Sequence, residues 1–224
     1  MQPDAAQTVR MASRAMARHG LAHAYGHVSL RLDNARFLVS PARPLIAVSR
    51  DDPGVVVTLN GDLPQEALPE VRIHREIYRR RPSIGGIVRV QPPAIMALSA
   101  LGRTPGVHHG LGTYFAPAAP LWSGVDLVRD DDSAVRLAVA LGDAAAIVLR
   151  GNGCVCAAES LPDAASLAFF LEDAARLDLA ILSTSLSSSA LQYSPEESAR
   201  RAVRAGALFE RMWQFLCTGD PEWQ

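Results

Sequence analysis

Glu70 and His74 stand four residues apart in a segment with helical periodicity. That spacing puts a carboxylate and an imidazole on one face of a helix, where they could form an acid/base couple or contribute ligands to a metal. The same spacing suits an ordinary exposed hydrogen-bonded pair. An acid in a first helical turn is also favoured simply because the positive helix end stabilises its charge. The pair alone therefore leaves its role open.

Hydroxyl, imidazole and guanidinium groups elsewhere suggest a cleft that binds an anion. His27 and Ser29 alternate along a strand-like run, so both should point to one side of a sheet. Ser40 and Arg43 follow a second such run, where they could hold a carboxylate or phosphate. Each pattern also occurs on ordinary exposed strands. Further polar candidates lie in loops, which often carry sites: the adjacent His108 and His109, and the turn Arg150-Gly151-Asn152-Gly153.

The inventory of charged residues excludes several classes of chemistry. All 22 basic residues are arginine, which rules out a lysine Schiff base, lysine-anchored pyridoxal phosphate and the phosphate loop that ends in lysine. With 22 basic and 23 acidic residues the formal charge is −1, so no nucleic-acid partner and no membrane partner is expected. Of the three cysteines, Cys154 and Cys156 should share one face of a strand as buried free thiols.

Length and hydropathy predict a globular chain with a sizeable core. The 224 residues are 49% hydrophobic and 20% charged, as in soluble globular proteins. No apolar run reaches the roughly 18 residues that suggest a membrane span. The first twenty residues are amphipathic, unlike a secretory signal. We therefore expect a cytoplasmic protein in which residues 1–224 form one domain.

Strand-like and helix-like segments interleave with mostly short connections but without strict alternation. This pattern predicts an α/β fold, in which helices pack on a mixed sheet. The expected helices are 8–19, 69–80, 94–101, 130–141, 162–183 and 195–217. The expected strands are 27–32, 36–40, 55–59, 84–90, 145–149 and 154–157. Residues 103–124 are rich in glycine and proline, which predicts loops around one or two short strands.

The order of several motifs adds a family resemblance. The motifs are ARHGLAHAYGHVSLRL, FLVSPAR, LPEVRIHREIYRRRPSIGGIV, LRGNGCVCAAESL and LEDAARL. Over roughly residues 8–215 the chain resembles the class II aldolase/adducin family. The resemblance implies a three-layer α/β/α sandwich with a central mixed β-sheet, and a homotetramer with clefts between subunits. The family's well-known enzymes are zinc-dependent lyases that cleave sugar phosphates, and epimerases and decarboxylases also belong to it.

The resemblance also shows where this chain departs from the family. Family enzymes hold a divalent metal with a His-x-His pair and a third histidine, and these positions read Arg89, Gln91 and Asn152 here. Arginine has no lone pair to give and amides are poor zinc ligands, so no metal is expected at this place and no cofactor is predicted. Glu70 falls on the family's acid/base carboxylate. The positions that fall in the family's anion-binding segments are His27, Ser29, Ser40 and Arg43.

The leading hypothesis is a metal-independent lyase that acts on a small anionic carbonyl compound. Glu70 would move the proton, and Arg89 would stabilise the oxyanion together with Gln91 and Asn152. Decarboxylation, an aldol or retro-aldol step on an activated substrate, tautomerisation or cyclisation would suit a guanidinium in place of a metal ion. Further candidates for substrate binding, in a loop that the family uses to close the neighbouring subunit's cleft, are His108, His109 and Tyr114.

Two alternatives stay open. An adducin-like protein would serve in assembly or ligand binding, with Arg89 and its neighbours merely filling the vacated metal site. A sealed pocket, or an ion pair between Arg89 and Glu70, would favour this alternative. In the other alternative a metal is retained but relocated, with Glu70 joined by His74, His108 or His109.

Overall fold

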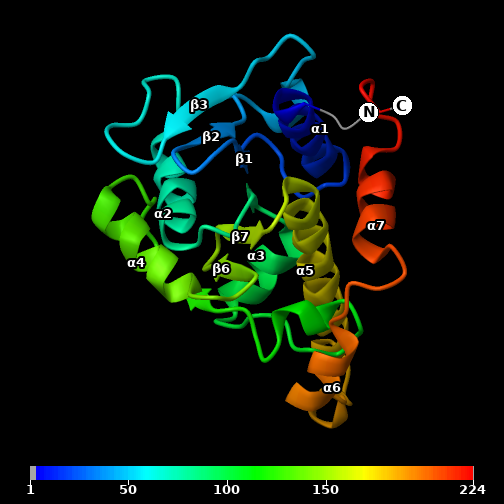
Figure 1. Ribbon diagram of the computed structural model, residues 1–224. Coiled ribbons are helices and arrows are strands. Elements are labelled where there is room, and N and C mark those ends of the chain that lie inside the picture. Colours follow the sequence, from blue (N-terminus) through cyan, green and yellow to red (C-terminus); the bar gives the residue numbers. More distant parts are fainter. Residues whose placement is uncertain (1–3, 224) are drawn as a thin grey trace.

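The computed structural model describes residues 4–223 and shows a seven-stranded sheet between two layers of helices (Figure 1). Across the sheet the strands are β3 (Val55–Thr58), β2 (Arg36–Val39), β1 (His27–Arg31), β4 (Gly86–Val90), β7 (Gly153–Ala158), β6 (Ala146–Leu149) and β5 (Leu121–Trp122). Neighbouring strands are antiparallel, except that β5 and β6 are parallel. The predicted mixed sheet is therefore confirmed.

Helices cover both faces of this sheet. Alternate residues of each strand point to opposite faces, and their apolar side chains form two separate hydrophobic cores. The helices that pack on one face are α1 (Ala5–Arg18), α3 (Pro93–Ala100), α5 (Leu161–Leu182) and α7 (Leu208–Cys217). The helices that pack on the other face are α2 (Arg72–Arg80) and α4 (Asp131–Leu141). Val28 and Val88 face the first core, whereas Ile87 and Val155 face the second. This arrangement confirms the predicted three-layer α/β/α sandwich.

Most elements begin and end within three residues of their predicted bounds. The exception is the helix predicted over 195–217, which is wrong. The structure instead has α6 (Pro195–Arg201) and α7, separated by residues 202–207. Gly206 and Ala207 have φ values of 68° and 51°, in the left-handed region that a right-handed helix does not use. The helical segment is therefore interrupted there, and the chain returns to the core as α7.

The three cysteines are free and buried. Cys154 and Cys156 are buried free thiols that face one core from β7, as predicted. Within residues 4–223, no helix has both the length and the apolar character needed to cross a bilayer.

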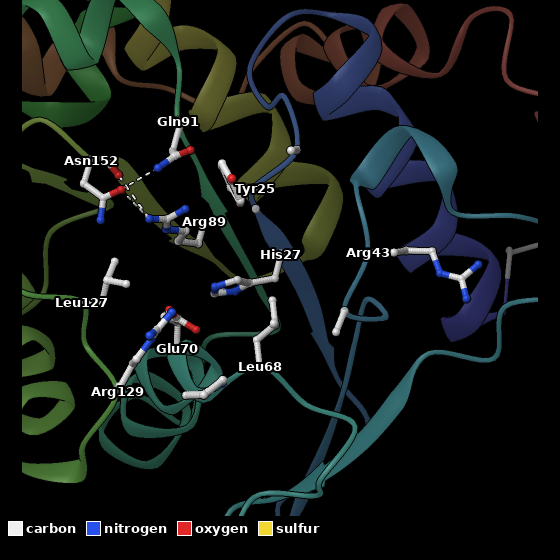
Figure 2. Close-up of a pocket in the computed structure, with 14 residues that line it drawn as sticks. Tyr25, His27, Arg43, Leu68, Glu70, Arg89, Gln91, Leu127, Arg129 and Asn152 are labelled. Atoms are coloured by element: carbon white, nitrogen blue, oxygen red, sulfur yellow. Dashed lines mark hydrogen bonds and ion pairs between the residues drawn. The ribbon is translucent and has the colours of Figure 1, made fainter.

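The sheet brings chemistry-bearing residues of β1 and β4 to the face covered by α2. In the antiparallel register His27 lies directly opposite Arg89, and Ser29 lies opposite Ile87. Side chains that are paired in this way project from the same face. His27 and Arg89 accordingly extend into one shared space (Figure 2).

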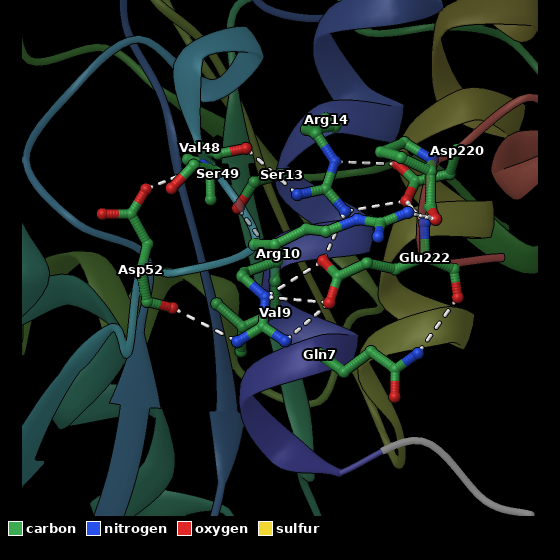
Figure 3. A network of polar contacts seen from close by, with 12 residues as sticks. Gln7, Val9, Arg10, Ser13, Arg14, Val48, Ser49, Asp52, Asp220 and Glu222 are labelled. Atoms are coloured by element: carbon green, nitrogen blue, oxygen red, sulfur yellow. Dashed lines mark hydrogen bonds and ion pairs between the residues drawn. The ribbon is translucent and has the colours of Figure 1, made fainter.

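A buried ion cluster fastens the C-terminal segment to α1 (Figure 3). The guanidinium of Arg14 donates to both carboxylate oxygens of Asp220, at 2.9 and 2.7 Å, and Arg18 donates to Asp220 at 2.6 Å. Glu222 accepts from Arg10 at 2.6 Å and from Arg14 at 2.7 Å. The Asp220 side chain is 0% exposed. Bidentate, charge-assisted contacts of this kind are the strong ones, so the cluster fixes residues 218–223 against the first helix.

Candidate active site

A cavity of about 580 Å³ lies where β1 begins and β4 ends. This volume is in the usual range for a small-molecule site. Residues 24–27 and 42–43 form one wall, and residues 68–70, which lead into α2, form another. The remaining wall comes from the end of β4, the segment that precedes α4, and the β6–β7 turn. Six separate stretches of the chain thus meet around one space (Figure 2).

The charges around this cavity are mainly positive. Arg43, Arg89 and Arg129 contribute guanidinium groups, and Glu70 contributes a carboxylate. The Arg43 side chain points away from Glu70 and Arg89 (Figure 2) and pairs with Asp52 at 3.3 Å. Even without Arg43 the cavity has two guanidiniums against one carboxylate, which favours an anionic ligand.

Arg89, Gln91 and Asn152 form a hydrogen-bonded cluster at one end of the cavity (Figure 2). Asn152 Oδ1 accepts from Arg89 Nη2 at 2.8 Å and from Gln91 Nε2 at 2.5 Å. The three groups are thus bonded to one another, whereas the hypothesis had all three donating to the substrate. Among the described residues nothing accepts a hydrogen bond from Arg89 Nε, which is buried, or from Nη1. Arg89 therefore keeps unused N–H donors.

The turn that carries Asn152 is held close to β4 by Gly153. A Cβ added at Gly153 would lie 2.0 Å from the Val90 carbonyl oxygen, and the φ angle of Gly153 is +84°. Only glycine fits this close approach in a left-handed conformation. The close approach brings Asn152 within reach of Arg89. Burial lowers the pKa of the Arg89 guanidinium, while the nearby Cys154 and Glu70 act in the opposite direction. Arginine nevertheless stays protonated in proteins.

This cluster does not fit the divalent metal that the family uses. A cation here would face a permanent positive charge, and the amide oxygen of Asn152 already accepts two N–H groups. Within residues 4–223 no group of three or more histidine, cysteine, aspartate or glutamate side chains is arranged to hold a metal ion. The relocated site proposed above is not assembled either, because both ring nitrogens of His74 already contact His27 and Ser29.

Glu70 lies at the entrance to α2, in the short 3-10 turn η2 (Pro69–Val71). Its carboxylate accepts a hydrogen bond from Arg129 Nε at 2.8 Å, and its side chain is 16% exposed. Arg129 directly precedes Asp130, whose side chain caps α4. The packing of α2 against α4 therefore brings together two residues that are 59 positions apart. Glu70 pairs with Arg129 and not with Arg89.

His27 and Ser29 point to the same side of β1, as predicted, but they have different surroundings. The His27 ring reaches the cavity, and its Nδ1 lies 2.7 Å from His74 Nε2. Ser29 is 0% exposed and contacts His74 Nδ1 at 2.5 Å and the Tyr78 hydroxyl at 2.9 Å. Ser29 therefore lies beneath the cavity wall and supports it. His74 faces this buried cluster and does not act as a partner of Glu70.

Besides Ser29, four predicted binding residues are not brought to the cavity of this chain. Ser40 is buried, and its hydroxyl accepts a hydrogen bond from the backbone N–H of Val28. The others belong to the segment that packs on α5, across the sheet from α2. His108 contacts the Leu191 carbonyl at 2.8 Å. The remaining two are His109, near Asp173, and Tyr114, stacked against Phe170. A role for this segment in a neighbouring subunit's cleft stays a prediction.

Sequence reasoning did not identify Arg129 or Tyr25 as cavity residues. Tyr25 directly precedes the Gly26-His27 motif, so its position along the chain was a usable signal. For Arg129 the sequence offers no signal of a cavity position beyond its place directly before the predicted helix cap at Asp130. Its contact with Glu70 depends on how two helices pack.

Comparisons with known proteins agree with this architecture. Residues 7–179 match the family model described as Class II Aldolase and Adducin N-terminal domain. The chain is 31% identical over 196 residues to a 3,4-dihydroxyphthalate decarboxylase of Arthrobacter keyseri, covering 80% of this chain and 79% of that protein. A 3,4-dihydroxyphthalate decarboxylase of Terrabacter sp. (strain DBF63) is also 31% identical over 196 residues, covering 78% and 80% of the two chains.

Solved structures share the fold at lower identity. The L-fuculose 1-phosphate aldolase from Glaciozyma antarctica PI12 has a TM-score of 0.78 at 18% identity, covering 95% of this chain and 88% of that one. YgbL from Escherichia coli, described as a putative aldolase/epimerase/decarboxylase, has a TM-score of 0.74 at 22% identity, covering 87% and 96%. The family match spans most of the chain, and the motifs and topology agree with it. The protein therefore belongs to the class II aldolase and adducin family.

Proposed function

We propose that this lyase is a decarboxylase of a small anionic acid that bears a hydroxyl or keto group next to the carboxylated carbon, and that it works without a metal. The relatives named as 3,4-dihydroxyphthalate decarboxylases support decarboxylation over the other lyase reactions. They also suggest a hydroxylated aromatic dicarboxylate as the substrate class. The observation that carries the proposal is that Arg89 and Glu70 face one cavity without pairing with each other.

In this mechanism Glu70 transfers one proton within the substrate. Its carboxylate takes the proton from the substrate hydroxyl and delivers it to the carbon that bears the carboxylate, which gives a β-keto acid. The bond to the carboxyl carbon then breaks and CO2 leaves. The electron pair passes to the keto oxygen, which becomes an oxyanion and later takes a proton from water. Overall, the carboxylate and one proton become a C–H bond and CO2.

Arg89 stabilises the charge that develops on that oxygen. Its Nη1 N–H groups have no acceptor among the described residues and are the donors left for a ligand, and Arg89 itself is 6% exposed. A preorganised donor of this kind acts most strongly on the transition state. Asn152 and Gln91 hold the guanidinium in place through Asn152 Oδ1. Arg129 holds the carboxylate of Glu70.

The non-catalytic alternative predicts a different arrangement. A sealed pocket or an ion pair between Arg89 and Glu70 would favour it. The cavity is instead lined by both residues, and each has another partner. These observations favour catalysis over a purely structural role.

The test is CO2 release from 3,4-dihydroxyphthalate and a panel of hydroxybenzoates and β-keto acids. Glu70→Gln should lower kcat by about 10²- to 10⁴-fold, the usual contribution of a positioned acid/base group. Glu66→Gln is the matched control, because Glu66 is an exposed acid just before the same helix and does not line the cavity. A wild-type rate for Glu70→Gln, or no CO2 from any compound, would refute the proposal.

Metal independence has its own measurement. Activity after prolonged treatment with a chelator should equal that of untreated protein, and elemental analysis should find no stoichiometric divalent metal. Loss of activity that a divalent cation restores would overturn this part of the proposal.

A further inference from the structure

A line of four polar side chains runs from the cavity wall into the core beneath α2. His27 begins it at the cavity, with its Nδ1 2.7 Å from His74 Nε2. His74 Nδ1 lies 2.5 Å from Ser29 Oγ, which lies 2.9 Å from the Tyr78 hydroxyl. All four residues are at most 3% exposed. The mechanism above gives no role to any of them.

The buried end of this line determines the direction of its hydrogen bonds. Each of the three links holds one proton. Among the described residues Ser29 Oγ is the one hydrogen-bond partner of the Tyr78 hydroxyl, so Tyr78 donates to Ser29. Ser29 then donates to Nδ1 of His74, and His74 Nε2–H donates to Nδ1 of His27. The opposite order would leave the buried Tyr78 hydrogen without an acceptor, which corresponds to a preference of roughly tenfold or more.

This direction fixes the tautomer of His27. Because Nδ1 accepts from His74, the single ring proton of a neutral His27 lies on Nε2. The ring reaches into the cavity between Arg89 and Glu70 (Figure 2). Burial, with smaller contributions from His74 and Arg89, holds the pKa of His27 well below its ordinary value. Burial likewise lowers the pKa of His74 to about 3. Both rings are therefore neutral near pH 7.

The sheet register places this N–H beside the guanidinium. His27 and Arg89 are directly opposite each other on β1 and β4. Both side chains therefore leave the same face of the sheet, one as a neutral donor and the other as a charged one. A neutral imidazole can stabilise an oxyanion without giving up its proton.

We propose that His27 is a catalytic residue whose Nε2–H binds, together with Arg89, the oxygen on which charge develops, and that Ser29, His74 and Tyr78 are positioning residues that fix its tautomer. The inference rests on the proposed decarboxylation. It adds a second donor for the oxyanion and gives a function to a buried polar line that packing alone does not require.

The first test reads the tautomers directly in protein that carries ¹⁵N-labelled histidine, without substrate. Long-range ¹H–¹⁵N correlation should show the Nε2–H form for both His27 and His74. Neither ring should titrate from about pH 5.5 to about pH 8. The groups that face them are Arg89 from β4, Tyr78 from α2 and Glu70 across the cavity. A Nδ1–H or doubly protonated His27 would overturn the inference whatever the activity.

The second test perturbs the line without touching the cavity. Ser29→Ala removes the hydroxyl that connects Tyr78 with His74 and so sets the direction of the hydrogen bonds. The two tautomers of His27 should then become comparably populated. The fraction of competent enzyme, and with it kcat, should then fall about twofold with little change in KM. Ser166→Ala is the matched control, because Ser166 is another serine that is 0% exposed, and it bonds only within α5. An unchanged His27 tautomer in folded Ser29→Ala would contradict the proposed line.

The third test addresses the donor itself. His27→Leu should lower kcat by about 10²- to 10³-fold, the cost of losing one oxyanion donor. His27→Gln keeps an N–H donor on a side chain of similar reach and should recover part of that loss. Equal rates for the two variants would refute the donor role.

The outcomes separate the two proposals. The tautomer measurement needs no substrate, so its failure in a protein that releases CO2 removes the inference and leaves the decarboxylase proposal intact. Correct tautomers in a protein that releases no CO2 from any compound would instead remove the proposed function, and with it the role given to His27.

Discussion

Replacing Asp220 by asparagine tests how the C-terminal segment is held. The Asp220 carboxylate is 0% exposed and accepts from Arg14, whose side chain is 7% exposed, and from Arg18. Removing one partner of a buried ion pair costs about 3–5 kcal/mol because the other charge stays buried. Arg14 still has Glu222 as a partner at 2.7 Å, so the lower end of that range, about 3 kcal/mol, applies. For a chain of this size, that corresponds to a fall in Tm of about 6–12 °C.

The same variant predicts a dependence on pH. Burial acts to raise the pKa of Asp220, but hydrogen bonds from Arg14 and Arg18 outweigh it and hold the pKa below its ordinary value. A carboxylate whose pKa is lower in the folded state stabilises the fold above its unfolded pKa, about 3.9. That contribution is lost as the pH falls through the folded pKa. The difference in stability between wild type and Asp220→Asn should therefore be constant near neutral pH and shrink below about pH 4.

Thermal and urea unfolding measured from pH 3 to pH 8 are the appropriate assays. Asp33→Asn is the matched control, because Asp33 pairs with Arg36 at 2.7 Å on the surface, with side chains 41% and 54% exposed. It should leave Tm almost unchanged, since exposed pairs contribute little. If Asp220→Asn lowered Tm no more than Asp33→Asn does, the reasoning about the buried cluster would be refuted.

Two backbone positions give further predictions. Gly153→Ala should destabilise the fold by about 2–4 kcal/mol, from a left-handed residue plus overpacking against Val90. Gly151→Ala, with φ +64° and nothing within 4 Å of the added Cβ, should cost only about 1–2 kcal/mol in the same urea unfolding series; equal losses would contradict the clash. Ala207→Gly should stabilise by about 0.5–1 kcal/mol, because glycine relieves the φ of 51°, and a lower Tm would show that the left-handed residue is not strained.

The fold could largely be read from periodicity and breaker residues. Strands of alternating polarity and helices bounded by proline and glycine lie where these patterns place them. The break between α6 and α7 could not be read in this way. Its apolar spacing continues the helical pattern, whereas Gly206 and Ala207 take left-handed conformations. Such conformations depend on the packing of α7 with α1 and α5, which local sequence does not reveal.

The candidate site could be predicted only in part. Alternation along β1 correctly puts His27 and Ser29 on one side, and the motif order groups Arg89 with Asn152. The contact of Glu70 with Arg129 could not be foreseen, because it joins the starts of two different helices. Spacing within one helix also suggested a pair of Glu70 with His74. The direction of each side chain decides such contacts, and spacing alone does not give it.

Alternation of side chains along β1 and β4 separates the positions that line the cavity from the positions that form the hydrophobic core. Positions 27 and 89 present their side chains to the cavity, whereas the next register pair, Val28 and Val88, is 0% exposed in the opposite core. Cavity groups can therefore be exchanged at one set of positions while the set that keeps the molecule folded is left unchanged. A library randomised at positions 27, 89 and 91 should hence yield mostly well-folded proteins whose cavities differ in charge and hydrogen bonding.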